Sequence, residues 1–176
     1  MNIRNMVYAI CHAMVLFFFA SGNVSALELR SSDIGEGRVV PLEFTGMGAD
    51  ISPELSWDDV PAGTESFAII VNDPDAPLGT WTHWVVYDIP PDVRLMKRDG
   101  PGPVGPEGAP VLGVNSWGRA GYGGPMPPKG SEHRYVFTVY ALDKKLSEPG
   151  MSERELLNAM DGHILASAAI TARFGR

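Results

Sequence analysis

Short apolar runs alternate with prolines and glycines along most of this chain, and that alternation restricts what the chain can fold into. The 176 residues include 20 Gly and 15 Pro. Many of them separate runs that are rich in β-branched and aromatic residues. Such runs favour strands, whereas proline and glycine favour the turns between them. We therefore predict one mainly β domain, an α+β or sandwich fold with one or two peripheral helices.

The predicted strands are distributed over nearly the whole chain after residue 26. They are 27–30, 39–44, 51–57, 66–72, 82–89 and 132–142. A turn plus a last strand is expected over 164–174, and a further short element over 93–96. Pro41 interrupts the second of these strands, which favours an edge or a bulge there. In 132–142 both alternating sets of residues are largely apolar, and this pattern predicts a central strand.

The clearest helix signal lies in the C-terminal region. Ser152-Glu-Arg-Glu155 has the pattern of a capping box, which marks the start of a helix. Leu156, Leu157 and Met160 are predicted to form its apolar face. Gly162 is expected to end it.

Residues 1–26 have the three parts of a secretory signal peptide. A basic start at Arg4 is followed by an apolar run over 7–20 and by the small-residue end Val24-Ser25-Ala26. An uncleaved membrane anchor is the alternative, but the apolar run is shorter than the roughly 20 residues that span a bilayer. We predict cleavage after Ala26, a folded domain over 27–176, and a periplasmic or secreted location.

Charge and cysteine content narrow the expected partners. The chain has 14 Lys and Arg against 21 Asp and Glu, a net charge of −7, and loss of Arg4 with the signal peptide makes it −8. No basic stripe or cationic amphipathic helix is present, so we expect neither nucleic-acid binding nor stable membrane insertion after cleavage. The one cysteine, Cys11, lies in the predicted signal peptide, so the domain must be stable without disulfides.

A polar loop between the predicted strands 66–72 and 82–89 is the first candidate for a functional site. It brings Asp73, Asp75 and His83 within a short stretch that also contains two prolines, which limit backbone freedom. This concentration indicates a preformed polar site. Asp and Pro are also ordinary turn residues, so a purely structural role is the alternative.

The long glycine- and proline-rich stretch 100–130 is the second candidate region. Irregular stretches of this length are usually functional or disordered, and the aromatic residues near Asn115-Ser-Trp-Gly118 favour function. Gly123 and Gly124 would let backbone N–H groups approach a ligand closely. His133, at the entrance of the next strand, is either a hydrogen-bonded structural residue or part of a site.

Four motifs, taken together and in order, resemble the phosphatidylethanolamine-binding protein family, also called the Raf kinase inhibitor protein family. They are Asp73-Pro-Asp-Ala-Pro77, Thr82-His-Trp84, Tyr122-Gly-Gly-Pro-Met-Pro-Pro128 and Gly130-Ser-Glu-His-Arg-Tyr135. Asp50-Ile-Ser-Pro-Glu-Leu-Ser-Trp57 and Asp161-Gly-His-Ile-Leu-Ala166 are similar to stretches of its bacterial branch. The resemblance implies a β sandwich built around a large antiparallel sheet with peripheral helices.

The resemblance also implies a pocket for phosphate-like anions, including the phosphoethanolamine head group. The positions that match the family's pocket are Asp73, Asp75, Trp81, His83, Gly124, Pro127 and His133. Pro125-Met126 stand where animal members have small residues, so the width of the pocket is expected to differ. The resemblance implies neither a metal nor a cofactor.

Our hypothesis for this pocket is anion binding without catalysis. His83 and His133, together with backbone N–H groups near Gly124, would donate hydrogen bonds to the oxygens of the anion. Asp73 or Asp75 would accept an ammonium group or a phosphate proton, and a phosphoethanolamine zwitterion meets both demands.

Two other classes of function stay open. The same aspartates and histidines could ligate zinc in a hydrolase, although the chain lacks tight ligand spacing such as His-x-x-x-His and a Gly-x-Ser-x-Gly elbow. The family also includes kinase inhibitors and a protease inhibitor, so an exported interaction or inhibitor module acting on a protein partner is the main rival. A large exposed apolar patch would favour that rival, and self-association as a homodimer stays open.

Overall fold

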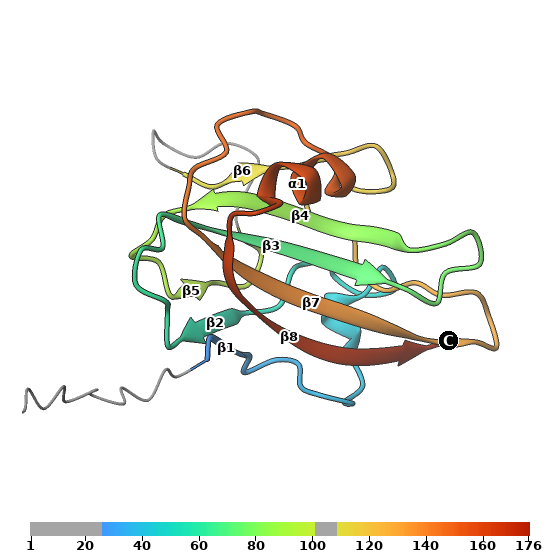
Figure 1. Ribbon diagram of the computed structural model, residues 1–176. Coiled ribbons are helices and arrows are strands. Elements are labelled where there is room, and N and C mark those ends of the chain that lie inside the picture. The colour runs from blue at the N-terminus through green and yellow to red at the C-terminus, as the bar shows by residue number, and fades with distance from the viewer. Residues whose placement is uncertain (1–25, 101–108) are drawn as a thin grey trace, which may run out of the picture.

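A computed structural model describes residues 26–100 and 109–176, which form two antiparallel sheets and one α-helix (Figure 1). The predicted signal peptide lies outside the described residues except for Ala26. No helix within the described ranges is long and apolar enough to cross a bilayer. The prediction of a mainly β fold with a large antiparallel sheet is confirmed.

The larger sheet has five strands in the order β6-β4-β3-β7-β8. These strands are β3 Ser66–Asp73, β4 Trp81–Ile89, β6 Val111–Leu112, β7 Glu132–Leu142 and β8 Ile164–Gly175. β3 occupies the middle of the sheet because its apolar residues are buried on both faces. β7 is internal, but it lies between β3 and the edge strand β8 and is not the central strand that its pattern predicted.

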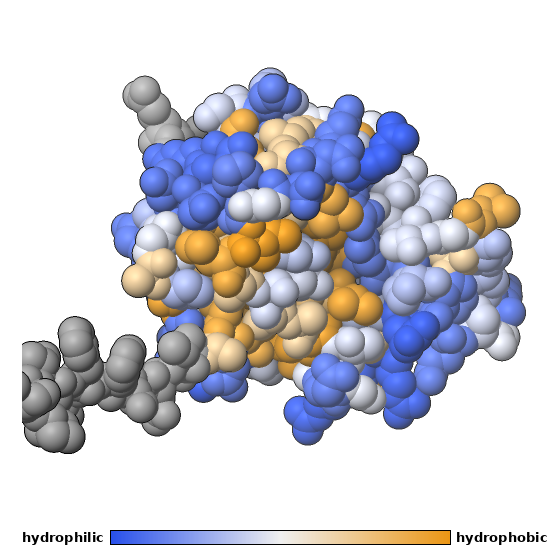
Figure 2. All heavy atoms as spheres, in the orientation of Figure 1, coloured by the Kyte–Doolittle hydropathy of each residue, from blue (hydrophilic) through white to orange (hydrophobic). Residues whose placement is uncertain are grey.

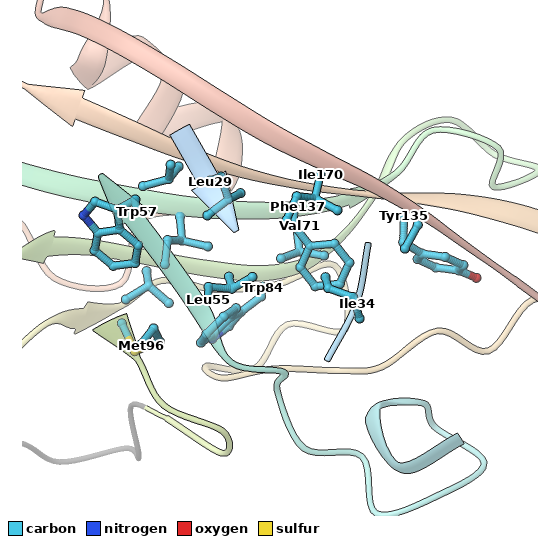
Figure 3. Packing of buried hydrophobic residues seen from close by; sticks show 14 of the residues in the cluster. Leu29, Ile34, Leu55, Trp57, Val71, Trp84, Met96, Tyr135, Phe137 and Ile170 are labelled. Atoms are coloured by element: carbon cyan, nitrogen blue, oxygen red, sulfur yellow. The ribbon is translucent and has the colours of Figure 1, made fainter. Parts of the chain in front are cut away.

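A smaller sheet of three short strands covers one face of the larger sheet. Its order is β1-β2-β5, with β1 Glu28–Arg30, β2 Leu55–Asp58 and β5 Leu95–Met96. The main core fills the space between the two sheets, where Trp57 of β2 packs against Phe67 of β3 with ring centroids 5.3 Å apart. Figure 3 shows this cluster, with Trp57 and Met96 at one end and Tyr135 at the other.

Helix α1, Glu153–Met160, covers part of the opposite face of the larger sheet (Figure 1). Its predicted capping box is present: the Ser152 side chain accepts a hydrogen bond from the backbone N–H of Glu155, whose side chain accepts one from the backbone N–H of Ser152. Leu156 and Met160 are buried in a second cluster. Leu157 was expected there but is 39% exposed, because successive helix residues are about 100° apart and only one side of α1 meets the sheet.

The prediction of a strand over 39–44 is wrong. Val39 forms only an isolated bridge to Arg173, and Leu42–Phe44 is a 3-10 helix, η1. Pro41 explains the difference, since it lacks a backbone N–H and its φ of −58° suits the start of a helical turn. The strand predicted over 51–57 is shorter than expected and begins only at Leu55.

Candidate functional site

The candidate site lies at one end of the larger sheet, where β3 ends and β4 and β7 begin (Figure 1). β3 pairs antiparallel with both neighbours, which brings Asp73 at its end opposite Trp81 at the start of β4. Two residues further along β4 is His83, and His133 lies near the start of β7. The sheet therefore brings together residues that are up to 60 positions apart in the sequence.

These residues border a cavity of about 330 Å³ with a polar base and an apolar rim. The base is formed by Asp73, Trp81, His83, His133 and Tyr135. The rim is formed mainly by Pro77, Leu78, Trp117, Met126, Pro127 and Pro128. Leu78 is 96% exposed at the tip of its loop. The cavity can therefore hold a small polar group at its base and contact an apolar group at its mouth.

His133 and Asp73 form a buried pair at the base of the cavity. Nδ1 of His133 lies 2.7 Å from Oδ2 of Asp73. Oδ1 of Asp73 accepts a hydrogen bond from the backbone N–H of Asp75 at 2.9 Å. Both carboxylate oxygens are thus engaged, and the bond to Nδ1 fixes the orientation of the His133 ring and leaves Nε2 as its second polar atom.

His83 is held differently, by a backbone carbonyl. Its Nδ1 lies 2.5 Å from the carbonyl oxygen of Gly123. The ring stands edge-on to Trp117 and to Tyr135, with centroid distances of 5.0 and 5.2 Å. Burial is the main influence on this imidazole and lowers its pKa, although the Gly123 carbonyl and the Asp73 carboxylate oppose that shift.

Two hydrogen-bond donors of the cavity wall have no partner among the described residues. They are the hydroxyl of Tyr135 and Nε1 of Trp81, and both atoms are buried. Figure 3 shows the Tyr135 hydroxyl directed away from the other labelled core side chains. Burial raises the pKa of Tyr135, and the nearby Asp73 carboxylate acts in the same direction, so its hydroxyl stays protonated. Unpartnered buried donors are uncommon in folded proteins, and these two have almost no accessible surface.

Asp75 was predicted to lie in the pocket, but it forms an ion pair beside the cavity. Its carboxylate accepts hydrogen bonds from Nε and Nη2 of Arg134, at 2.9 and 2.7 Å, and from the backbone N–H of the same residue at 2.9 Å. These bonds lower the pKa of Asp75 to about 2. Asp75 therefore fixes the loop against β7, and its oxygens are not free for an ammonium group.

Gly124 also differs from the prediction, since its N–H group is not available to a ligand. The N–H of Gly124 donates to Oδ1 of Asp50 at 2.6 Å, and that of Gly123 donates to the backbone carbonyl of His83 at 3.0 Å. Gly124 is required for another reason: a Cβ there would lie 2.6 Å from the backbone oxygen of Phe44. Because Gly124 has no Cβ, the loop that carries Pro127 can pack closely on η1.

The structure thus brings five of the seven predicted residues to the cavity, which are Asp73, Trp81, His83, Pro127 and His133. Sequence reasoning missed Tyr135, because it alternates with core residues of β7, and Trp117, which lies in an irregular loop. The described residues contain no group of three or more His, Cys, Asp or Glu side chains placed to hold a metal ion.

Comparison with known proteins agrees with the fold and the motifs. The family model described as "Phosphatidylethanolamine-binding protein" matches residues 30–175. This chain therefore belongs to the phosphatidylethanolamine-binding protein family, as its motifs predicted. Its relatives include the "UPF0098 protein" of Aquifex aeolicus, 44% identical over 167 residues, which are 93% of this chain and 96% of the relative. Another is the "UPF0098 protein YbhB" of Escherichia coli K12, 44% identical over 157 residues, 84% of this chain and 99% of the relative.

Two crystal structures from bacteria have the same fold. The putative phosphatidylethanolamine-binding protein homologue CT736 of Chlamydia trachomatis has a TM-score of 0.78 and 39% identity, and the match covers 86% of this chain and 98% of that one. YbcL of Escherichia coli has a TM-score of 0.77 and 33% identity, with 86% and 99% covered. Its structure is described as that of a new member of the mammalian family.

Proposed function

We propose that this protein is a non-enzymatic, exported binding protein for a small phosphate-like anion, such as a phosphoethanolamine head group. The observation that carries the proposal is the cavity base, where the imidazoles of His133 and His83 are held in fixed orientations by Asp73 and by the Gly123 carbonyl. Oriented polar side chains at the base of a cavity whose remaining lining is apolar favour a small polar ligand.

The charges around the cavity limit how such a ligand is held. Among the described residues no Lys or Arg side chain lines the cavity, and Asp73 contributes a carboxylate. Hydrogen bonds must therefore supply most of the attraction. This arrangement favours a small anion of low charge.

Binding without catalysis is supported by the chemistry of the lining residues. The described lining has no serine, threonine, cysteine or lysine side chain, so the possible nucleophiles are limited to its Asp, His and Tyr side chains. The Asp73 carboxylate is engaged by two hydrogen bonds. Export is supported by the basic, apolar and small-residue pattern of residues 1–26.

Calorimetric titration with phosphoethanolamine tests the proposal. We expect His133→Ala to weaken binding by about tenfold or more, because it removes one oriented polar side chain from the base of the cavity and leaves Asp73 unpaired. His163→Ala is the matched control: it also breaks a histidine–aspartate pair, with Asp143, but on the surface and outside the cavity lining. Equal affinity of the two variants, or no binding to the wild-type protein, would contradict the proposal.

An apolar surface supports a second candidate, an interaction module. Figure 2 shows apolar residues gathered on the face that carries β7, β8 and α1. Leu157, Ile164 and Leu165 of this face are all about 40% exposed, and residues 164–170 contain no charged side chain. In a molecule of net charge −7, an uncharged strip is where two copies repel each other least, so a second copy of the chain is the partner that fits.

Sedimentation over a range of protein concentrations tests this second candidate. We expect a dimer that Leu165→Lys converts to a monomer, because the new charge would be buried in the contact. Leu42→Lys, which changes an exposed leucine on η1, should leave the association unchanged. A wild-type protein that is monomeric at every concentration would exclude a homodimer.

A further inference from the structure

The strand that carries His83 does not pair regularly with its neighbour. Val71 of β3 lies opposite Trp84 of β4, but the next residue of β3, Asn72, lies opposite Thr82. His83 therefore has no partner on β3. One extra residue in one strand of an antiparallel pair is a β-bulge, and bulges are common beside functional sites, where they redirect a side chain.

The bulge determines which face of the sheet His83 reaches. Residues directly opposite each other on paired strands point to the same face. A regular pairing would place His83 opposite Asn72, whose side chain bonds Glu153 on the α1 face. With the bulge, Thr82 takes that position, and His83 lies on the cavity face with Asp73. The imidazole therefore lines the cavity only while the bulge is kept.

Glu153 of α1 bonds the two residues that face each other at the bulge. Its Oε1 accepts a hydrogen bond from Nδ2 of Asn72 at 2.6 Å, and its Oε2 accepts one from the hydroxyl of Thr82. One carboxylate thus joins β3 and β4 at the point where their register changes. Thr82 is buried and Glu153 is half-buried, so water competes little for these bonds.

Ser116 holds Thr82 in a different way, through the backbone. The N–H of Thr82 donates to Oγ of Ser116 at 2.8 Å, and the carbonyl of Thr82 accepts from the N–H of Ser116 at 2.9 Å. These bonds do not reach β3. Among the described residues, Glu153 is the one whose side chain bonds side chains on both strands of the bulge.

We infer that Glu153 is a positioning residue for the cavity: from the opposite face of the sheet, it holds the bulge that directs His83 into the site. As far as it concerns a ligand, this role rests on the proposed function. Glu153 lies outside the cavity lining. Its loss should therefore change the orientation of His83 without removing any group from the site.

Nuclear magnetic resonance of the histidine rings tests this role without a ligand. The His83 ring stands edge-on to Trp117 and Tyr135, with centroid distances of 5.0 and 5.2 Å, so ring currents make its proton signals sensitive to its orientation. In the full chain, we expect Glu153→Ala to move these signals. Glu153→Gln has the same length and can still form hydrogen bonds with both partners, so it should retain most of the wild-type shifts.

Met160→Ala is the matched control for a general loosening of α1. Met160 is buried at the other end of the helix from Glu153. Its substitution should move the signals of His163, whose backbone N–H donates to the Met160 carbonyl, and leave those of His83 unchanged. Thr82→Val removes one of the two bonds from the strand side and should move the His83 signals as Glu153→Ala does. Circular dichroism checks that the variants are folded.

Calorimetric titration with phosphoethanolamine measures the effect on binding. Glu153→Ala should weaken binding by about threefold or more, because the orientation of one imidazole at the base of the cavity is lost. Glu153→Gln should weaken it less, and Met160→Ala should bind as the wild-type protein does.

The outcomes separate this inference from the proposed function. Unchanged His83 signals in Glu153→Ala would overturn the inference, and so would an equal change in Met160→Ala, because the helix as a whole would then be the cause. Signals that move without a loss of affinity would overturn it as well. If the wild-type protein binds no phosphoethanolamine, the proposed function fails, while the ring signals still decide whether Glu153 positions His83.

Discussion

At the scale of single residues, Asp75 and Arg134 show how an ion pair beside the cavity depends on pH. Three hydrogen bonds from Arg134 reach the Asp75 carboxylate and lower its pKa to about 2. An unfolded chain has an aspartate pKa of about 3.9. Because the pKa is lower in the folded protein, the pair adds stability above about pH 4 and loses it as the pH falls towards 2.

We predict that Asp75→Asn lowers the free energy of unfolding by about 0.5 to 1 kcal/mol at neutral pH. The value is small because water screens this pair: the Arg134 side chain is 63% exposed. The difference from wild type should shrink as the pH is lowered from 4 to 2. Thermal unfolding followed by circular dichroism over this range measures it.

Asp92→Asn is the control for this prediction, since Asp92 is exposed and forms no ion pair among the described residues. It should leave the free energy of unfolding nearly unchanged. A difference between Asp75→Asn and wild type that stays constant from pH 7 to pH 2 would show that the ion pair is not its cause.

The candidate site could be predicted from sequence where local spacing carries the information. Asp73 ends one strong strand signal and His83 lies near the start of the next, so their proximity follows from a hairpin-like return of the chain. The partner of Asp75 could not be found this way, because Arg134 is 59 residues away. Tyr135 was missed because its place in the alternating pattern of β7 predicts only that the side chain is buried. The pattern does not show which part of the fold the hydroxyl group lies in.

At the scale of elements, long strands with apolar runs were predicted well. Among the short elements, β1 and β5 lie within the predicted 27–30 and 93–96, whereas the strand predicted over 39–44 is absent. β3, β4, β7 and β8 match their predicted ranges to within a few residues. The segment 39–44 has β-forming residues, but Pro41 and the contacts of Phe44 with the core decide its 3-10 conformation. Pairing partners and sheet order depend on contacts between distant parts of the chain, which no local pattern contains.

Helix α1 also shows that a local sequence pattern does not contain the contacts between distant parts of the chain. The capping box correctly marks where it begins, because that signal involves only bonds between Ser152 and Glu155. Which leucine is buried depends on the direction from which the sheet approaches. Leu156 is fully buried and Leu157 is not, although both fit the apolar face of a helix of this length.

At the scale of the whole molecule, the five-stranded sheet has a core on each of its faces. Ile69 packs in the cluster shared with the three-stranded sheet, and its neighbour Ile70 packs in the cluster beneath α1. Both side chains are at most 1% exposed. Because β3 contributes side chains to both cores, a substitution that disrupts either core should destabilise the same cooperative unit.

We predict that Ile69→Ala and Ile70→Ala each lower the free energy of unfolding by about 2 to 5 kcal/mol, because each leaves a cavity in a packed core. Both variants should still unfold in one transition, with equal midpoints by far-ultraviolet and near-ultraviolet circular dichroism. Val39→Ala, at an exposed position, is the control and should change the free energy by less than about 0.5 kcal/mol. Two separate transitions in either variant would show that the cores fold independently.

The burial of Leu27 determines whether the predicted signal peptide could be cleaved before or after folding. The predicted cleavage point is the peptide bond between Ala26 and Leu27, yet Leu27 is only 5% exposed and belongs to the main core. A peptidase needs an accessible, extended segment on both sides of the bond it cuts. Once β1 has paired with β2, that segment is held in the folded domain. If the chain is cut at this predicted bond, the cut must therefore precede the folding of β1 onto β2.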